Sequence, residues 1–188
     1  NAVPLLIRPA ESTEAAALSF AQERLWFLDQ LEPGNPFYTV PLALSLKGRL
    51  DIASLESSIN TVVRRHQVLR TTFPAVNGKP VPRVTATLNV ALPLRDLSGL
   101  PDAVRAEEAD RLILGEARQP FDLAQGPLLR TQLLRLGPEH HVLLFTMHHI
   151  VADGWSLGVL VKELAASYQA SRATGESVPT PLPELPIQ

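Results

Sequence analysis

Two adjacent histidines, His148 and His149, end an apolar stretch, and Asp153 and Gly154 follow a few residues later. An unperturbed imidazole titrates at about 6.5, so a neutral histidine there can take a proton from an amine or hydroxyl nucleophile. Because consecutive strand residues point to opposite faces, one ring faces the open side of a sheet and the other packs inward. These residues favour proton-transfer chemistry at a strand end; the alternative is a hydrogen-bonded core histidine beside an Asp-Gly turn.

The spacing of the histidines argues against a metal site. His140 and His141 begin the same stretch that His148 and His149 end, and a strand that rises about 3.3 Å per residue separates the two pairs by roughly 23 to 26 Å. One ion cannot bind both pairs, and the two rings of one pair point to opposite faces. We therefore expect no bound metal.

Residues 154–158 read GWSLG and match the G-x-S-x-G pattern of a serine nucleophile. Hydrolases with that pattern place the acid and then the histidine after the serine, whereas no histidine follows Ser156 in this sequence. We expect Ser156 to help start a helix instead.

Composition excludes several classes of protein. The 188 residues are 45% hydrophobic, which suffices for a core, and their formal net charge of -2 gives no positive surface for a nucleic acid. The lack of cysteine excludes disulfides and thiolate metal sites. Apolar runs such as 142–145 are too short to span a bilayer, and no signal peptide is visible, so we expect no membrane partner and a cytoplasmic location.

Hydrophobic periodicity predicts a mixture of helices and hairpins that must position these residues. Helices are expected over 20–31, 52–66, 101–118 and 157–171, and strands over 38–46, 71–76, 79–84, 88–94, 128–136 and 141–148. The strand over 141–148 is apolar enough to be central in a sheet. This order predicts an α/β layered lobe.

Three segments together resemble the condensation domains of non-ribosomal peptide synthetases. They are residues 18–28 (LSFAQERLWFL), 65–73 (RHQVLRTTF) and 147–156 (MHHIVADGWS). The last is shared with chloramphenicol acetyltransferase and other CoA-dependent acyltransferases, whereas the first two specify the condensation branch. The resemblance implies one chloramphenicol-acetyltransferase-like lobe, a mixed sheet flanked by helices, with the second lobe absent. Residues 1–176 would be the N-terminal lobe, and the Pro-rich 177–188 a connector toward the missing C-terminal lobe.

The resemblance also implies a reaction and a set of partners. Family members join a donor thioester to the amine of an acceptor thioester, with both substrates on phosphopantetheine arms of upstream and downstream peptidyl carrier proteins. The lobe itself would bind no cofactor directly. Its further partners would be an adjacent adenylation domain and the C-terminal lobe of the same domain. Since the substrates meet in a tunnel between two lobes, the isolated fragment would be inactive.

Residue by residue, the resemblance assigns His149 to the family's catalytic position, as general base or as a positioner of the amine. His148 is then the inward, structural partner. Asp153 would point away from the substrate and pair with an arginine, for which Arg65 and Arg70 are the candidates, because a buried carboxylate needs such a partner.

Gly154 would keep the tunnel clear for the pantetheine arm, while its plainer role is that of a turn glycine. The intact histidine pair argues against heterocyclising relatives, and Trp155 with Ser156 resembles domains that take an L-configured or fatty-acyl donor. Two other functions stay open from the residues: a stand-alone acyltransferase that uses free acyl-CoA, and a non-catalytic lobe that docks carrier proteins.

Overall fold

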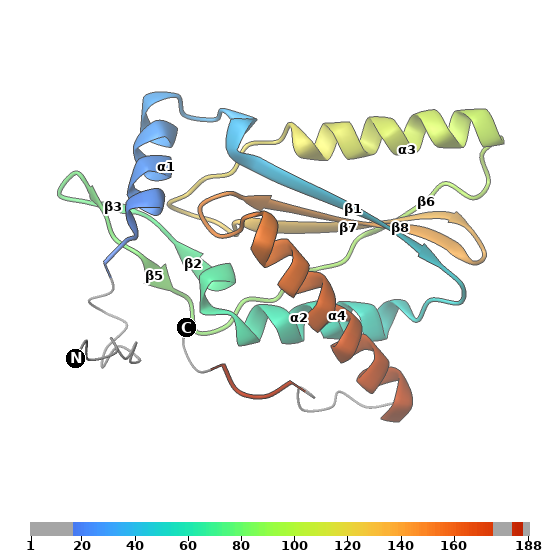
Figure 1. The fold of residues 1–188 in the computed structure, drawn as a ribbon. Coiled ribbons are helices and arrows are strands. Elements are labelled where there is room, and N and C mark those ends of the chain that lie inside the picture. Colours follow the sequence, from blue (N-terminus) through green and yellow to red (C-terminus); the bar gives the residue numbers. More distant parts are fainter. Residues whose placement is uncertain (1–16, 175–181, 186–188) are drawn as a thin grey trace, which may run out of the picture.

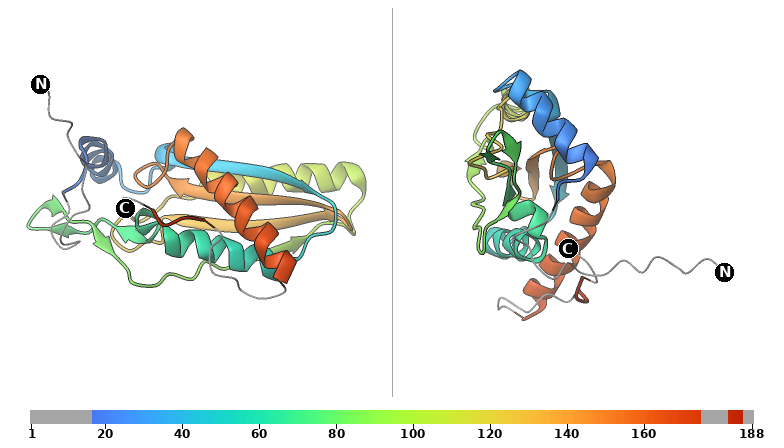
Figure 2. Two further views of the ribbon diagram at one scale, coloured as in Figure 1. Left: turned by 60° about the horizontal axis from the view of Figure 1, so that its bottom comes forward. Right: turned by 90° about the vertical axis from the view of Figure 1, so that its left-hand side faces the viewer.

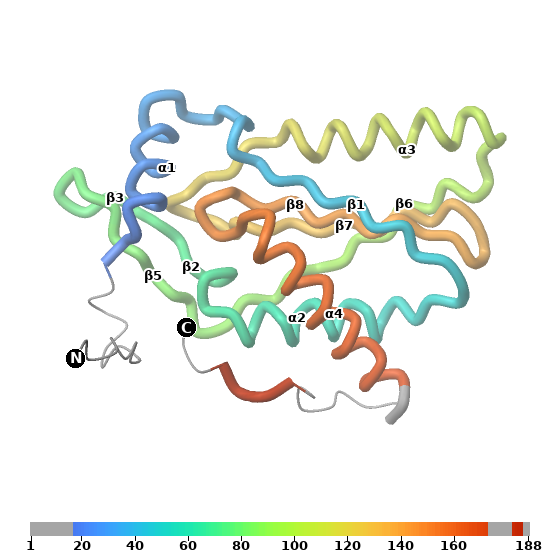
Figure 3. The backbone as a smooth tube through the Cα atoms, viewed as in Figure 1, coloured from blue at the N-terminus to red at the C-terminus, as the bar shows by residue number. Residues whose placement is uncertain are grey.

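A four-stranded mixed sheet forms the centre of the protein in this computed structural model, which describes residues 17–174 and 182–185 (Figure 1). The strand order is β1-β8-β7-β6, with β1, β8 and β7 antiparallel and β6 parallel to β7. The strands are β1 (Thr39–Lys47), β6 (Leu94–Asp96), β7 (Leu129–Gly137) and β8 (His140–His148). The prediction of a central strand over 141–148 is confirmed, because β8 lies between β1 and β7 (Figure 3).

Helices cover both faces of this sheet. Those on the faces are α2 (Ile52–Arg65), α3 (Asp102–Ala117) and α4 (Gly154–Thr174), whereas α1 (Phe20–Leu31) lies at one end of the sheet (Figure 1). Figure 2 shows α2 and α4 together on one face, with α3 on the other. The predicted α/β architecture is therefore confirmed.

Alternation along β7 and β8 divides the core between the two faces. Leu133 and Leu143 are fully buried in the larger cluster, which includes the apolar residues of α2 and α4. Their neighbours Leu134 and Leu144 belong to a smaller cluster beneath α3. A strand buried on both faces reads as a continuous apolar run, which explains the composition of β8.

Local capping signals set where the first two helices begin. Ser19 and Gln22 form a reciprocal capping box at the start of α1. Asp51 accepts a hydrogen bond from the backbone N–H of Ser54 at 3.0 Å and caps α2. Both helices therefore begin where the sequence predicts.

The predicted hairpin around residues 77–78 forms, but its strands are broken. β3 (Ala75–Val76) pairs with β4 (Lys79–Pro80), and β2 (Thr71–Thr72) pairs separately with β5 (Arg83–Val84). Prolines lack the N–H that a longer ladder needs. The strand predicted over 88–94 is also wrong in extent, since regular pairing with β7 covers only Leu94–Asp96.

The predicted connector at 177–188 lies outside the described residues except for 182–185. The division of the chain at residue 176 therefore stays a prediction. Of the helices within the described ranges, none has the length and apolar character needed to cross a membrane.

Candidate functional site

The loop from β8 to α4 borders a cavity of about 700 Å³. Residues 149–153 and Ser156 form one side of it, the first turns of α1 form another, and Tyr38 and Val68 also contribute. Strand ends and the loops that follow them commonly carry binding and catalytic groups. This cavity is the candidate site, and it contains both His149 and Asp153.

His149 is exposed at the cavity and is held by two hydrogen bonds. Its backbone N–H donates to the carbonyl of Tyr38 at 2.8 Å, and its Nδ1 lies 2.7 Å from the carbonyl oxygen of Ala152. A carbonyl only accepts, so Nδ1 carries the proton in this contact. The neutral ring then keeps a lone pair on Nε2, which is the atom available as a base.

His148 lies in the core rather than in the cavity. Its Nδ1 accepts a hydrogen bond from the backbone N–H of Ile150 at 3.1 Å, so the ring is neutral with an acceptor at Nδ1. Burial, helped by the nearby His149, lowers the pKa of His148 to about 4. Its ring contacts the Tyr38 ring, with centroids 6.3 Å apart, and the Phe121 ring in a T-shaped arrangement, with centroids 6.2 Å apart.

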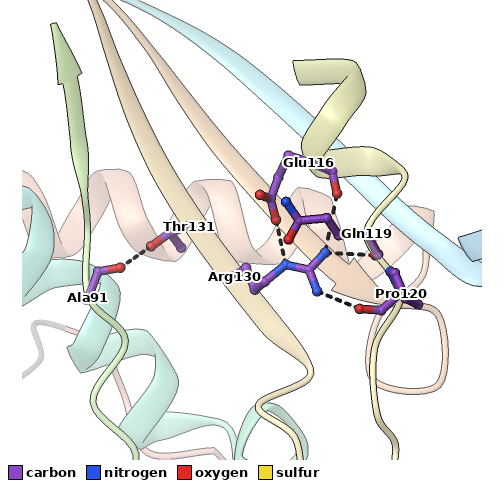
Figure 4. Close-up of polar contacts among 6 residues, drawn as sticks. All are labelled: Ala91, Glu116, Gln119, Pro120, Arg130 and Thr131. Carbon is purple, nitrogen blue, oxygen red and sulfur yellow. Dashed lines mark hydrogen bonds and ion pairs between the residues drawn. The ribbon is translucent and has the colours of Figure 1, made fainter. Parts of the chain in front are cut away.

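Phe121 is itself fixed by Arg130, whose guanidinium lies 3.9 Å from the Phe121 ring centroid. Arg130 Nε pairs with Glu116 Oε1 at 2.5 Å, and its other nitrogens donate to the carbonyls of Glu116, Gln119 and Pro120 (Figure 4). These carbonyls lie at and just after the end of α3, where the helix's own hydrogen-bond pattern ends. The Phe121 ring beside His148 is therefore held in place by Arg130, which is itself hydrogen-bonded to its surroundings.

Asp153 and Ser156 start α4 by capping each other. Asp153 Oδ1 accepts from the backbone N–H of Ser156 at 2.8 Å, and Ser156 Oγ accepts from the backbone N–H of Asp153 at 2.7 Å. The hydrogen bonds from Ser156 lower the pKa of the Asp153 carboxyl. The Oγ of Ser156 also donates to the Asp153 carbonyl at 2.9 Å, so Ser156 serves the helix start, as predicted.

The expected ion pair between Asp153 and an arginine is wrong for this structure. Asp153 is exposed and forms no ion pair with any described residue. Arg65 Nε instead pairs with Glu163 Oε1 at 3.2 Å, and Arg70 donates to the carbonyls of Val63, Arg64, Thr85 and Ala86. The physical reason is that the N–H groups at the start of α4 already satisfy an exposed carboxylate.

Gly154 is the first residue of α4 and borders open space. A Cβ placed on it would have no neighbouring atom within 4 Å, and its backbone is not in the left-handed region that favours glycine. Nothing in the described part of this lobe therefore requires a glycine at this position.

Sequence reasoning missed Glu163, whose carboxylate contacts both Arg65 and His66 of the second motif. Its Oε2 lies 2.6 Å from His66 Nε2, and its Oε1 binds Arg65. The signal was present, because Glu163 is an acid between the buried apolar residues Leu160 and Leu164 of α4. A lone acid on the buried face of a helix indicates a cationic partner.

The sequence patterns also did not predict the contacts that α1 makes with other elements. No residue of α1 is fully buried, yet Trp26 Nε1 donates to the Phe73 carbonyl at 3.0 Å, and Gln22 Nε2 donates to the Ile150 carbonyl at 3.4 Å. These two bonds fix the first motif against the second and third motifs.

The two histidine pairs lie at opposite ends of β8, as the strand prediction requires. His140 Nε2 lies 3.2 Å from Ser45 Oγ, far along the sheet from the cavity. Within residues 17–174 and 182–185, no three side chains of the metal-binding types gather around a common point.

Comparison of the chain with known proteins assigns it to a family. The family model described as "Condensation domain" matches residues 12–184. A linear gramicidin synthase of Brevibacillus parabrevis is 50% identical over 153 residues, which are 81% of this chain and 3% of that protein.

Solved structures give the same result. The first condensation domain of the calcium-dependent antibiotic synthetase, in complex with a substrate analogue, superposes with a TM-score of 0.80 at 30% identity over 88% of this chain and 40% of that one. The X-domain from teicoplanin biosynthesis superposes with a TM-score of 0.83 at 31% identity over 96% of this chain and 37% of that one. The chain thus spans about 40% of these structures, which corresponds to one lobe.

Proposed function

The chain belongs to the condensation-domain family of non-ribosomal peptide synthetases, and from this membership we propose that the lobe supplies the catalytic face for peptide-bond formation between two carrier-bound thioesters. The whole domain would use donor and acceptor groups on the phosphopantetheine arms of an upstream and a downstream carrier protein. An adjacent adenylation domain and the C-terminal lobe of the same domain would be the remaining partners. Residues 1–176 would form the N-terminal lobe and 177–188 the connector.

The observation that carries this proposal is the hydrogen bond between His149 Nδ1 and the Ala152 carbonyl at 2.7 Å. It leaves Nε2 as a proton acceptor on a residue that lines the cavity. In the proposed step the acceptor amine attacks the donor carbonyl carbon while Nε2 takes its proton. The C–N bond forms, the C–S bond breaks, and the proton passes to the departing thiolate.

The remaining predicted residues take supporting roles in this proposal. His148 would anchor the loop as a neutral ring, and Asp153 would fix the start of α4. Arg65 would act through Glu163 and Arg70 through the carbonyls that it binds, both as structural support. Gly154 would leave room for a pantetheine arm.

Replacing His149 by alanine in the two-lobed parent tests the proposal. A general base contributes about 10²- to 10⁴-fold, so amide formation between loaded carrier proteins should slow by that factor in a single-turnover assay. His140→Ala is the matched control, because His140 is an exposed histidine at the other end of β8. A His149→Ala enzyme with the parent's rate would contradict the proposal.

Free acyl-CoA in place of the donor carrier protein separates this function from a stand-alone acyltransferase. We expect turnover only with the carrier-bound donor. A non-catalytic docking lobe would bind carrier proteins and give no product even with its C-terminal lobe present.

A further inference from the structure

Tyr38 contacts both histidines of the site from a different element. It ends the short turn Pro36–Tyr38, which Asn35 caps by accepting from the Phe37 N–H at 2.9 Å. Its carbonyl receives the His149 N–H at 2.8 Å, and its ring lies against His148 with centroids 6.3 Å apart. The position of Tyr38 relative to His149 is thus fixed by the backbone and the ring, and these contacts leave the phenol hydroxyl unused.

The hydroxyl of Tyr38 makes no hydrogen bond to any residue in the described ranges, and Tyr38 lines the cavity together with His149. Other polar side chains that line the cavity already make hydrogen bonds within the protein: Gln22 Nε2 donates to the Ile150 carbonyl, and Ser156 Oγ donates to the Asp153 carbonyl. A phenol O–H donates a hydrogen bond and a carbonyl oxygen only accepts one, so the role of this hydroxyl toward a carbonyl oxygen is that of a donor.

Arg24 is the other polar cavity residue whose side chain has no hydrogen bond within the described part of the chain. It lies on an exposed position of α1, an element that precedes the turn holding Tyr38. Tyr38, in contrast, is tied to the backbone of His149. A donor whose position is fixed relative to the base suits a reaction in which both act on one carbonyl group.

We propose that the Tyr38 hydroxyl is a further catalytic group, which donates a hydrogen bond to the carbonyl oxygen of the donor thioester as negative charge develops there. This inference rests on the proposed function. When the amine nitrogen bonds to the carbonyl carbon, the oxygen becomes an alkoxide, which Tyr38 stabilises without giving up its proton. The amine proton moves to His149 Nε2 and then to the thiolate as the C–S bond breaks and the amide carbonyl re-forms.

Tyr38→Phe in the two-lobed parent removes one oxygen atom and keeps the ring against His148. Loss of one such donor costs about 10²- to 10³-fold in kcat, and we expect a decrease of that size with unchanged KM for the acceptor carrier and an unchanged melting temperature. Tyr168→Phe is the matched control. The Tyr168 hydroxyl accepts the Asp51 N–H at 2.9 Å and does not line the cavity, so its removal should leave kcat at the parent value.

Three results would overturn the inference. One is a Tyr38→Phe enzyme with the parent's kcat while His149→Ala is inactive, which would leave the proposed function standing. Another is a raised KM with unchanged kcat, which would place the hydroxyl in ground-state binding. The third is a fall in kcat for Arg24→Gln with no fall for Tyr38→Phe, which would assign the donor to Arg24. If His149→Ala also keeps the parent's rate, the proposed function itself fails.

Discussion

His66 Nε2 and Glu163 Oε2 lie 2.6 Å apart and join the end of α2 to the middle of α4. Arg65 approaches the other oxygen of the same carboxylate at 3.2 Å. All three side chains are largely buried, with between 11% and 21% of their surface exposed. Since α4 begins at the site loop and α2 ends at the second motif, this contact fixes two of the three motifs relative to each other.

Glu163→Ala should therefore destabilise the protein substantially. Removing one partner of a buried ion pair costs about 3 to 5 kcal/mol, because the other charge stays in a poorly solvated place. A large fall in melting temperature of the parent domain is the expected result. The control is Glu108→Ala, since the Glu108–Arg111 pair is a surface pair within one helix and should contribute little. Equal melting temperatures for the two variants would show that Glu163 is not a buried clamp.

Asp153→Ala should have a smaller effect on stability. Its carboxylate caps α4 and has no ion pair among the described residues, and the loss of an N-cap costs about 0.5 to 2 kcal/mol. Asp153→Ser should recover most of this loss, because serine also caps helices. A loss as large as that of Glu163→Ala would mean that Asp153 is paired to a buried arginine in the complete domain.

His148 should make stability depend on pH. Its folded pKa of about 4 lies below its ordinary value of 6.5, so below 6.5 the unfolded chain binds a proton that the folded chain does not. This difference in proton binding costs no stability above pH 6.5. The free energy of unfolding falls progressively as the pH drops toward about 4, by about 2 kcal/mol between pH 7 and pH 5. Denaturant midpoints at both pH values measure it. His148→Gln should flatten this dependence.

Features that depend only on neighbouring residues in the sequence predicted more of this structure than features that depend on residues far along the chain. The caps at Ser19 and Asp51 are complete within one turn, so both helix starts follow from the sequence. The strand predicted over 88–94 was wrong in extent, because the pairing of Leu94–Asp96 depends on β7, far along the chain. The resemblance implied a buried Asp153, whereas the residue is exposed, because the exposure of a loop residue depends on how the loop lies against its neighbours. Glu163 was missed because its partners come from another helix.

Gly154→Ala should separate the needs of the fold from those of the substrate. A Cβ at this position meets no described atom within 4 Å, and alanine favours a helix over glycine. We therefore expect an unchanged or slightly higher melting temperature. Condensation by the two-lobed parent should nevertheless slow, because the methyl group would narrow the path of a pantetheine arm. A lowered melting temperature, or an unchanged rate, would contradict this explanation.

The isolated chain should form no peptide bond above background even though His149 is in place. The chain spans about 40% of the length of the solved condensation domain that it matches. Positioning two tethered reactants contributes about 7 to 11 kcal/mol to such reactions, and in the proposed function it would require both walls of the tunnel. The measurement is a single-turnover assay with loaded donor and acceptor carrier proteins, with the two-lobed parent as the positive control. The C-terminal lobe added as a separate chain should restore part of the rate if it docks. If the lone lobe formed product at a rate near the parent's, the two-lobe explanation would be wrong, and a self-contained acyltransferase would account better for the site.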